Sequence, residues 1–188
     1  MKQCDLHKHI ARGEKTGARL CGNPLEEIAE DHMREREVCA LLDKLAQGLS
    51  VKEIEIEQML DFLQVQFPNH IADEENDLFP MMLKRCDPDD EIEKGIDRLR
   101  SDHGNALEDT AAILAILQRL RRTFSRLSEA DIGHINAFVC QSRRHLIFEN
   151  AVILPIARVR LGKRDLRAMK RHMLERRGLD TDWETAKC

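Results

Sequence analysis

The chain has 188 residues and a formal net charge of −4. This length fits a single domain that can bury a core without disulfide staples. The mildly acidic charge gives no reason to expect nucleic acid as a partner, because surfaces that bind nucleic acid are basic.

Charged residues make up 34% of the chain and hydrophobic residues 42%. This balance is typical of amphipathic helices, so we expect an all-α protein. No apolar stretch reaches the roughly eighteen residues of a membrane-spanning helix, and the amino terminus has no apolar run that could act as a signal peptide. The six cysteines are scattered without a C-x-x-C pair. We therefore expect a soluble protein with reduced thiols, located in the cytoplasm.

Residues 1–22 have weak hydrophobic periodicity, so we expect an N-terminal arm that precedes the core. Asn23 followed by Pro24 predicts the start of the first helix, because asparagine caps the first N–H groups and proline is favoured at the first helical position. Apolar positions continue at helical spacing to Gly48, a residue type that often ends helices. His32 lies on the inner face of this helix.

The second helix is expected to open at Ser50 with Glu53, which is the spacing of a capping box. Its apolar positions, which include Ile54, lead toward His70. Pro68 precedes this histidine and should kink or divide the helix, because proline lacks an N–H group and crowds the preceding turn.

Two further long helices are expected. One begins at Asp87 and Pro88 and runs to the basic residues 119–122. The other begins at Ser128, with an acidic residue three positions later, and continues to about Ile156.

A last helix is expected from about Lys163 to Arg177, with Gly178 as its stop. Short connections between long helices favour antiparallel neighbours. We therefore expect an up-down-up-down four-helix bundle over residues 23–157, followed by a basic C-terminal helix and tail over residues 158–188.

An internal repeat links residues 70–80 with residues 145–155. In each stretch a histidine is followed four residues later by a glutamate and ten residues later by a proline. A period of about seventy residues indicates a duplicated helical hairpin rather than a solenoid. Each copy is also preceded by an Asp–His pair, at Asp31–His32 and Asp102–His103.

Histidine and glutamate four residues apart on a helix lie on one face and can contribute to one metal site. Imidazole nitrogen and carboxylate oxygen suit first-row transition metals such as iron, manganese or zinc. Six side chains are too many for one tetrahedral zinc, whereas two histidines per ion with both glutamates bridging supply two metals. A solvent-derived bridge would leave one position open on each ion for an exogenous ligand. The candidate metal ligands are His32, His70, Glu74, His103, His145 and Glu149.

The order of these residues, with Glu-Glu-Asn-Asp-Leu-Phe-Pro at the end of the first pair, resembles the hemerythrin-like family, also called the HHE cation-binding domain. The resemblance spans about residues 24–157. It implies an antiparallel four-helix bundle in which the six candidates bind two iron ions with an oxo or hydroxo bridge. The pattern is nearer to the bacterial repair-of-iron-centres proteins than to the oxygen-carrying hemerythrins, which use five histidines, one glutamate and one aspartate.

These features predict a di-iron protein that binds or senses O2 or NO, or that handles iron under oxidative or nitrosative stress. Two alternatives stay open. One is a redox enzyme that breaks down peroxide or reduces nitric oxide, and the other is a regulatory protein that contacts a protein partner through its basic C-terminal helix. The chain has no tyrosine, which excludes a tyrosyl-radical mechanism. No membrane partner is expected.

Several residues near the ligands have an ordinary interpretation as well. Asp31 and Asp102 could orient a ligating imidazole, but adjacent residues on a helix point about a hundred degrees apart, so we expect both to be solvated. Glu75 could be a spare carboxylate near the metals, although its counterpart in the repeat is Asn150. The basic residues between 158 and 177 could dock an acidic partner or phosphate, but a solvated helix face is the simpler interpretation.

Overall fold

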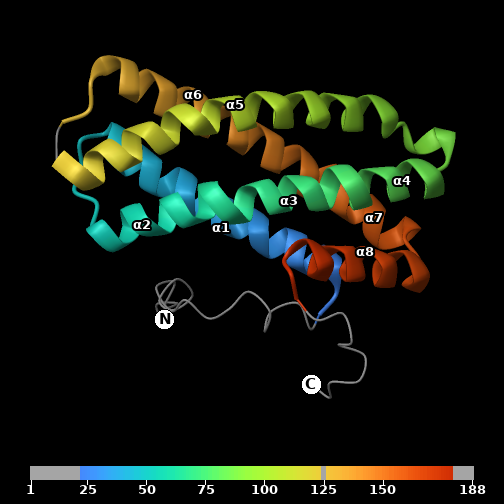
Figure 1. Cartoon of the computed structure of the whole chain (residues 1–188). Coiled ribbons are helices and arrows are strands. Elements are labelled where there is room, and N and C mark those ends of the chain that lie inside the picture. Colours follow the sequence, from blue (N-terminus) through green and yellow to red (C-terminus); the bar gives the residue numbers. More distant parts are fainter. Residues whose placement is uncertain (1–21, 124–125, 180–188) are drawn as a thin grey trace, which may run out of the picture.

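A computed structural model describes residues 22–123 and 126–179 of the chain (Figure 1). Most of these residues lie in helices, and the described residues form no β-strand. The all-α prediction is therefore confirmed, and the helices pack as a bundle. Apart from residue 22, the expected N-terminal arm lies outside the described residues, as does most of the expected tail.

The first helix, α1 (Pro24–Ala46), begins where the sequence predicts. The side chain of Asn23 accepts a hydrogen bond from the backbone N–H of Leu25 at 3.0 Å, and proline occupies the first helical position. The chain leaves the helix at Gly48, whose φ of +71° is a left-handed conformation that glycine adopts at little cost.

The second helix, α2 (Glu53–Asp61), begins later than the predicted cap at Ser50. Lys52 is the residue before the helix, and its backbone N–H donates to the Glu55 carboxylate at 2.7 Å. Ile54, one of the apolar positions expected to lead toward His70, is 56% exposed and does not take part in the buried face. The buried face of α2 consists of Ile56, Met59 and Leu60.

Three wide helical turns precede the prolines of the second and fourth helical regions. At the end of each turn a backbone N–H donates to the carbonyl five residues earlier rather than four. The residue that follows this donor is Pro68, Pro80 or Pro155. Proline supplies no N–H and its ring crowds the carbonyl four residues back, so a widened turn lets the helix continue past it. At Pro68 the expected kink or division takes the form of such a widened turn, and the helical backbone continues through it. The wide turns are η3 (Phe62–Gln66), η4 (Glu74–Leu78) and η6 (Glu149–Ile153), and the α-helical segments that follow them are α3 (Phe67–Asp73), α4 (Phe79–Arg85) and α7 (Leu154–Arg160).

The long helix α5 (Glu93–Thr123) begins several residues after the predicted Asp87–Pro88 start. The predicted cap instead opens a short 3-10 turn, η5 (Pro88–Asp90), in which the Asp87 N–H donates to the Asp90 carboxylate at 2.9 Å. Glu91 then adopts a left-handed φ of 49°, which ends that turn.

The remaining helices agree with the sequence. Helix α6 (Glu129–Phe148) is capped by Ser128, whose hydroxyl accepts from the Asp131 N–H at 3.2 Å. The last helix, α8 (Lys163–Arg176), is followed by Gly178 with a left-handed φ of 64°. No helix within residues 22–123 and 126–179 combines the length and apolar character needed to cross a membrane.

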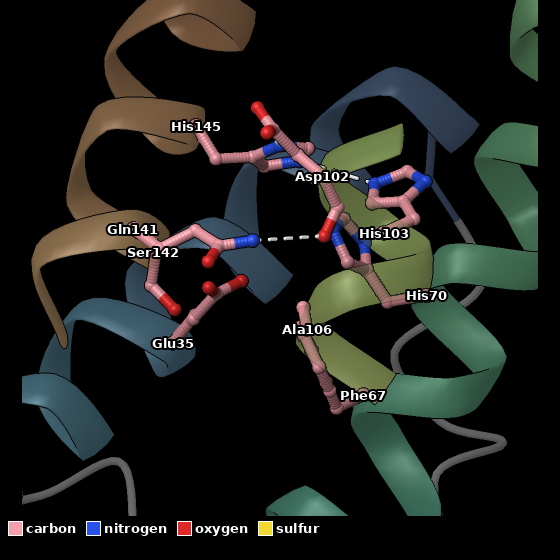
Figure 2. Close-up of a pocket in the computed structure, with 9 residues that line it drawn as sticks. All are labelled: Glu35, Phe67, His70, Asp102, His103, Ala106, Gln141, Ser142 and His145. Carbon is pink, nitrogen blue, oxygen red and sulfur yellow. Dashed lines mark hydrogen bonds and ion pairs between the residues drawn. The ribbon is translucent and has the colours of Figure 1, made fainter. Parts of the chain in front are cut away.

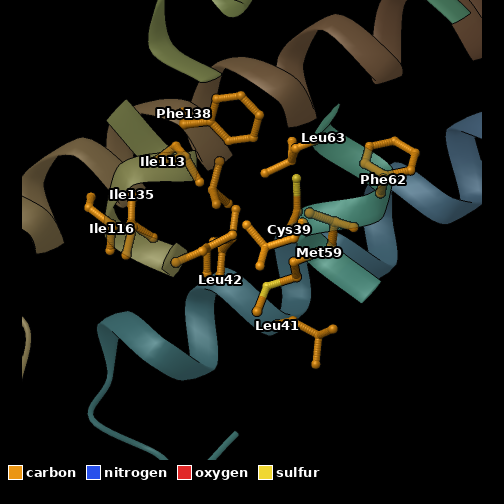
Figure 3. Close-up of a cluster of buried hydrophobic side chains, with 14 of the residues drawn as sticks. Cys39, Leu41, Leu42, Met59, Phe62, Leu63, Ile113, Ile116, Ile135 and Phe138 are labelled. Carbon is orange, nitrogen blue, oxygen red and sulfur yellow. The ribbon is translucent and has the colours of Figure 1, made fainter. Parts of the chain in front are cut away.

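Two hydrophobic clusters divide the core along the bundle, and helix α1 packs against α6 while α6 packs against α5 (Figure 1). The first cluster, shown in Figure 3, includes Cys39, Leu42, Met59, Leu63, Ile113 and Phe138. The second includes Ile28, Leu78, Phe79, Leu99, Ile153 and Met173. On each of the four helical regions, the candidate ligands fall between a residue of one cluster and a residue of the other, so two dry layers flank the candidate site.

Candidate metal centre

All six candidate ligands converge in the middle of the bundle, and each is buried. The two glutamates are the first residues of the wide turns η4 and η6, so each repeat places its carboxylate at the same point of a proline-linked turn. Their ligand atoms form two groups within which all atoms lie within 4.8 Å of one another. Both glutamates belong to both groups, which are His32, His70, Glu74 and Glu149, and Glu74, His103, His145 and Glu149.

The Nε2 atoms of the four histidines point toward the two carboxylates. Glu74 lies 3.4 Å from His32, 3.6 Å from His70 and 3.3 Å from His103. Glu149 lies 3.2 Å from His32 and 3.1 Å from His145. The Nε2 atoms of His103 and His145 face each other at 3.1 Å. The Nε2 atom is therefore turned inward on all four histidine rings.

The chemistry of these buried groups fits metal cations. Both oxygens of Glu74, both oxygens of Glu149 and Nε2 of His32 are buried without a hydrogen-bond partner. Unpaired buried carboxylates are costly, and a cation at the shared position would neutralise both. Nitrogen and oxygen donors without thiolate suit first-row transition metals. The cluster could therefore hold metal ions, with each glutamate reaching two positions.

Without metal, the carboxylates and histidines of the cluster stabilise each other's charged forms. Burial raises the pKa of Glu74, but His70, His103 and His32 outweigh this effect and hold its pKa well below the usual value. Burial lowers the pKa of His103, but the Glu74 and Glu149 carboxylates raise the net pKa to about 9. Burial also lowers the pKa of His32, but the Glu149 and Glu74 carboxylates raise it well above its usual value. Protons therefore compete with metal for the histidine nitrogens.

Each of the four histidines meets a polar side chain at its outward nitrogen, Nδ1. His103 donates to the Glu75 carboxylate at 2.8 Å, and Nδ1 of His32 lies 3.0 Å from the Asn150 amide nitrogen. Such partners orient imidazole ligands and set which nitrogen carries the proton. The other two pairs are His70 with Asp31 at 3.7 Å and His145 with Asp102 at 3.8 Å.

The expectation that Asp31 and Asp102 are solvated is therefore wrong for Asp31, which is 2% exposed, while Asp102 is half-buried. The histidine that each aspartate faces is not the one adjacent to it in sequence. Asp31 on α1 instead faces His70 on α3, and Asp102 on α5 faces the nitrogen of His145 on α6. The open question about Glu75 is also answered, because it contacts the far side of His103.

A second buried charge cluster lies on the helix that carries His70 and Glu74. Asp73 and Asp77 are buried, and α8 packs against this segment. Arg177 donates to Asp73 at 2.6 Å, and Arg176 donates to Asp77 at 2.7 Å and also pairs with Asp73. The interpretation of the basic helix as a solvated face is wrong for these two arginines and for Lys170, which is buried. The prediction of a solvated face holds for the exposed residues Lys163, Arg164, Arg167 and Arg171.

Sequence reasoning missed Glu35, a buried carboxyl on α1 one turn beyond His32. It lines a small cavity beside the cluster together with His70, His103 and His145 (Figure 2). The run Arg34-Glu35-Arg36-Glu37 reads as a charged solvent face. Glu35 nevertheless shares the inner face of α1 with Ile28, His32, Cys39 and Leu42, and this spacing could have identified it.

A helical bundle with a buried histidine and glutamate cluster defines the class as an all-α protein that could hold metal cations in its core. The profile of the hemerythrin HHE cation-binding domain matches residues 23–157 of the chain. The chain therefore belongs to the hemerythrin HHE cation-binding family. None of the individual curated proteins compared with the chain matches it.

Proposed function

We propose that the chain binds two iron ions through His32, His70, Glu74, His103, His145 and Glu149. The observation that carries this proposal is the pair of overlapping ligand groups that share both glutamates. A single cation would leave donors of one group unused, whereas two cations give every donor a role. When bound, the iron ions supply Lewis acidity and redox chemistry.

We further propose that the centre binds or senses a small ligand such as O2 or NO in the cytoplasm, or handles iron under oxidative or nitrosative stress. Support comes from the cavity beside the cluster, which is lined by His70 from one ligand group and by His103 and His145 from the other. Its volume open to the centre of a water-sized molecule is about 10 Å³. This is close to the minimum that holds one water, so the space suits only very small ligands.

The proposal includes the finer features expected from the sequence. These are the antiparallel up-down-up-down order of the helices and the domain boundaries of the bundle at residues 23 and 157. They also include a closer relationship to the repair-of-iron-centres proteins than to the oxygen-carrying hemerythrins. The pairing of four histidines with two glutamates supports that relationship, since it matches the ligand set expected for this type.

Rapid mixing of the reduced, iron-loaded protein with O2, NO or peroxide tests the proposed function. A binding or sensing protein should form a stable adduct with O2 or NO at a stoichiometric yield. Repeated consumption of nitric oxide or peroxide would instead favour the redox enzyme. A matched pair of variants controls for metal: Glu74→Gln should lose iron and the response, whereas the exposed Glu57→Gln should keep both.

A further inference from the structure

Glu35 is a buried carboxyl without a partner. Its side chain is 2% exposed, and within the described part of the chain it makes no hydrogen bond and no ion pair. No histidine nitrogen lies within 4.0 Å of its oxygens, and it belongs to neither group of candidate ligands. A group of this kind is costly to bury and is expected to have a role in function or structure.

The carboxyl of Glu35 points into the cavity that adjoins the candidate metal centre (Figure 2). Among the other polar groups of this cavity, Nδ1 of His70 and Nδ1 of His145 also lack a hydrogen-bond partner, but each faces a carboxylate, of Asp31 at 3.7 Å and of Asp102 at 3.8 Å. The Gln141 amide donates to the backbone carbonyl of Asp102 at 3.1 Å. Phe67 and Ala106 add apolar lining. Glu35 is thus a buried carboxyl with free hydrogen-bonding capacity in this space.

A groove lies next to this cavity and nearer the surface. It is lined by Arg98, Arg144 and Ile147, and it shares Asp102 and His145 with the cavity. Ile147 is 64% exposed, so the groove reaches solvent. His145 therefore lines both the groove and the cavity that contains Glu35.

We propose that Glu35 is the group that donates a hydrogen bond to an exogenous ligand held at the metal centre. The ligand class is a molecule of two or three heavy atoms with an acceptor atom at its free end. This inference rests on the proposed metal function. The low exposure of Glu35 supports a neutral carboxyl, since burial raises its pKa against the opposing effects of His70 and His145.

Azide is a suitable probe, because it is small, linear and carries an acceptor atom at its free end. Optical titration of the iron-loaded protein should give about tenfold weaker azide binding for Glu35→Leu, which removes the donor. Glu35→Gln keeps an N–H donor in a similar shape, so its dissociation constant should stay within about threefold of wild type. Glu30→Gln, at an exposed position of the same helix, should leave binding unchanged.

Any other pattern overturns the assignment. Tighter azide binding by Glu35→Leu would mean that an ionised Glu35 repels the ligand, while equal loss in both variants, or no loss in either, would mean that its donor is not used. Iron content is measured in every sample. If wild-type protein itself holds no iron, the proposed function fails, whereas normal iron with unaltered azide binding refutes only the role of Glu35.

The metal-free protein gives a second readout. A carboxyl buried for ligand binding weakens the fold, so Glu35→Gln should melt at the same temperature as wild type or a few degrees higher. A melting temperature that falls would show that Glu35 stabilises the fold, and would contradict the proposed role.

Discussion

The carboxylate of Glu75 accepts a hydrogen bond from Nδ1 of His103 at 2.8 Å, although the two residues come from different helices. A carboxylate can only accept, so this contact places the imidazole proton on Nδ1 and leaves Nε2 free to face the cluster. Arg100 donates to the second oxygen of Glu75 at 3.2 Å and holds the carboxylate in place.

Loss of this contact should weaken metal binding. We expect Glu75→Leu to lower iron affinity about tenfold, because an imidazole without its outer partner is less well oriented and less basic. Competition with a chelator measures the change, and Glu57→Leu on an exposed part of α2 is the matched control. Unchanged affinity in Glu75→Leu would show that the contact does not tune the site.

The contact between Arg177 and Asp73 should be important for the stability of the bundle. Arg177→Met leaves a fully buried carboxylate with less compensation, so the free energy of unfolding should fall on the order of 3 kcal/mol. Chemical denaturation followed by circular dichroism measures it. Adding Asp73→Asn should recover part of the loss. Arg171→Met, on the exposed face of α8, should change stability by less than about 0.5 kcal/mol. Equal effects of the two arginine substitutions would contradict this account.

The stability of the metal-free protein should depend on pH through the cluster. The pKa of His103 is about 9 in the folded chain, against 6.5 as its ordinary value. A raised pKa stabilises the folded state while the group is protonated, so this contribution is complete below pH 6.5 and is lost as the pH rises to 9. We expect the free energy of unfolding to fall over that window by roughly 3 kcal/mol at most.

Iron affinity should change in the opposite direction over the same window, because a histidine must lose its proton to bind metal. Binding at neutral pH should therefore release protons, which an indicator in weak buffer detects. A metal-free protein that gains stability between pH 6.5 and 9 would contradict the raised pKa of His103.

Gly95 provides a packing test near Glu149. A Cβ atom at this position of α5 would lie 2.7 Å from the ring of Phe148, whereas a Cβ at Gly104 meets nothing within 4 Å. Alanine at Gly104 should therefore stabilise the helix by about 0.5 to 1 kcal/mol. Alanine at Gly95 should destabilise by about 1 kcal/mol or more, since the ring must move. Thermal melting of the two variants distinguishes them, and equal shifts would exclude a tight contact.

Much of the fold could be predicted from local signals. Asn23 and Ser128 cap helices as expected, and Gly178 ends the last helix. The predicted starts of α2 and α5 were wrong, because other residues nearby cap these segments instead. The Glu55 carboxylate accepts from the backbone N–H of Lys52 before α2, and the Asp90 carboxylate accepts from that of Asp87 in a separate turn. Which of these caps forms depends on how the flanking chain packs.

The convergence of the six candidate ligands followed from the repeat, because the spacing of four residues fixes a helix face. Their outer partners could not be predicted in the same way. Asp31 and Glu75 each contact a histidine on a different helix, and the sequence alone does not specify the rotation of neighbouring helices. Glu35 was missed because charged residues surround it in sequence, while its position on the inner face of α1 buries it.

Metal analysis of the purified protein, combined with its absorption spectrum before and after reduction, tests the central claim most directly. After expression with ample iron, the chain should contain about two iron ions, one for each of the two overlapping groups that could hold a metal. It should also show the charge-transfer absorption of a bridged ferric pair, and this absorption should disappear on reduction. Glu74→Gln with Glu149→Gln should abolish both. Colourless wild-type protein without iron, or iron retained by the double variant, would contradict the account.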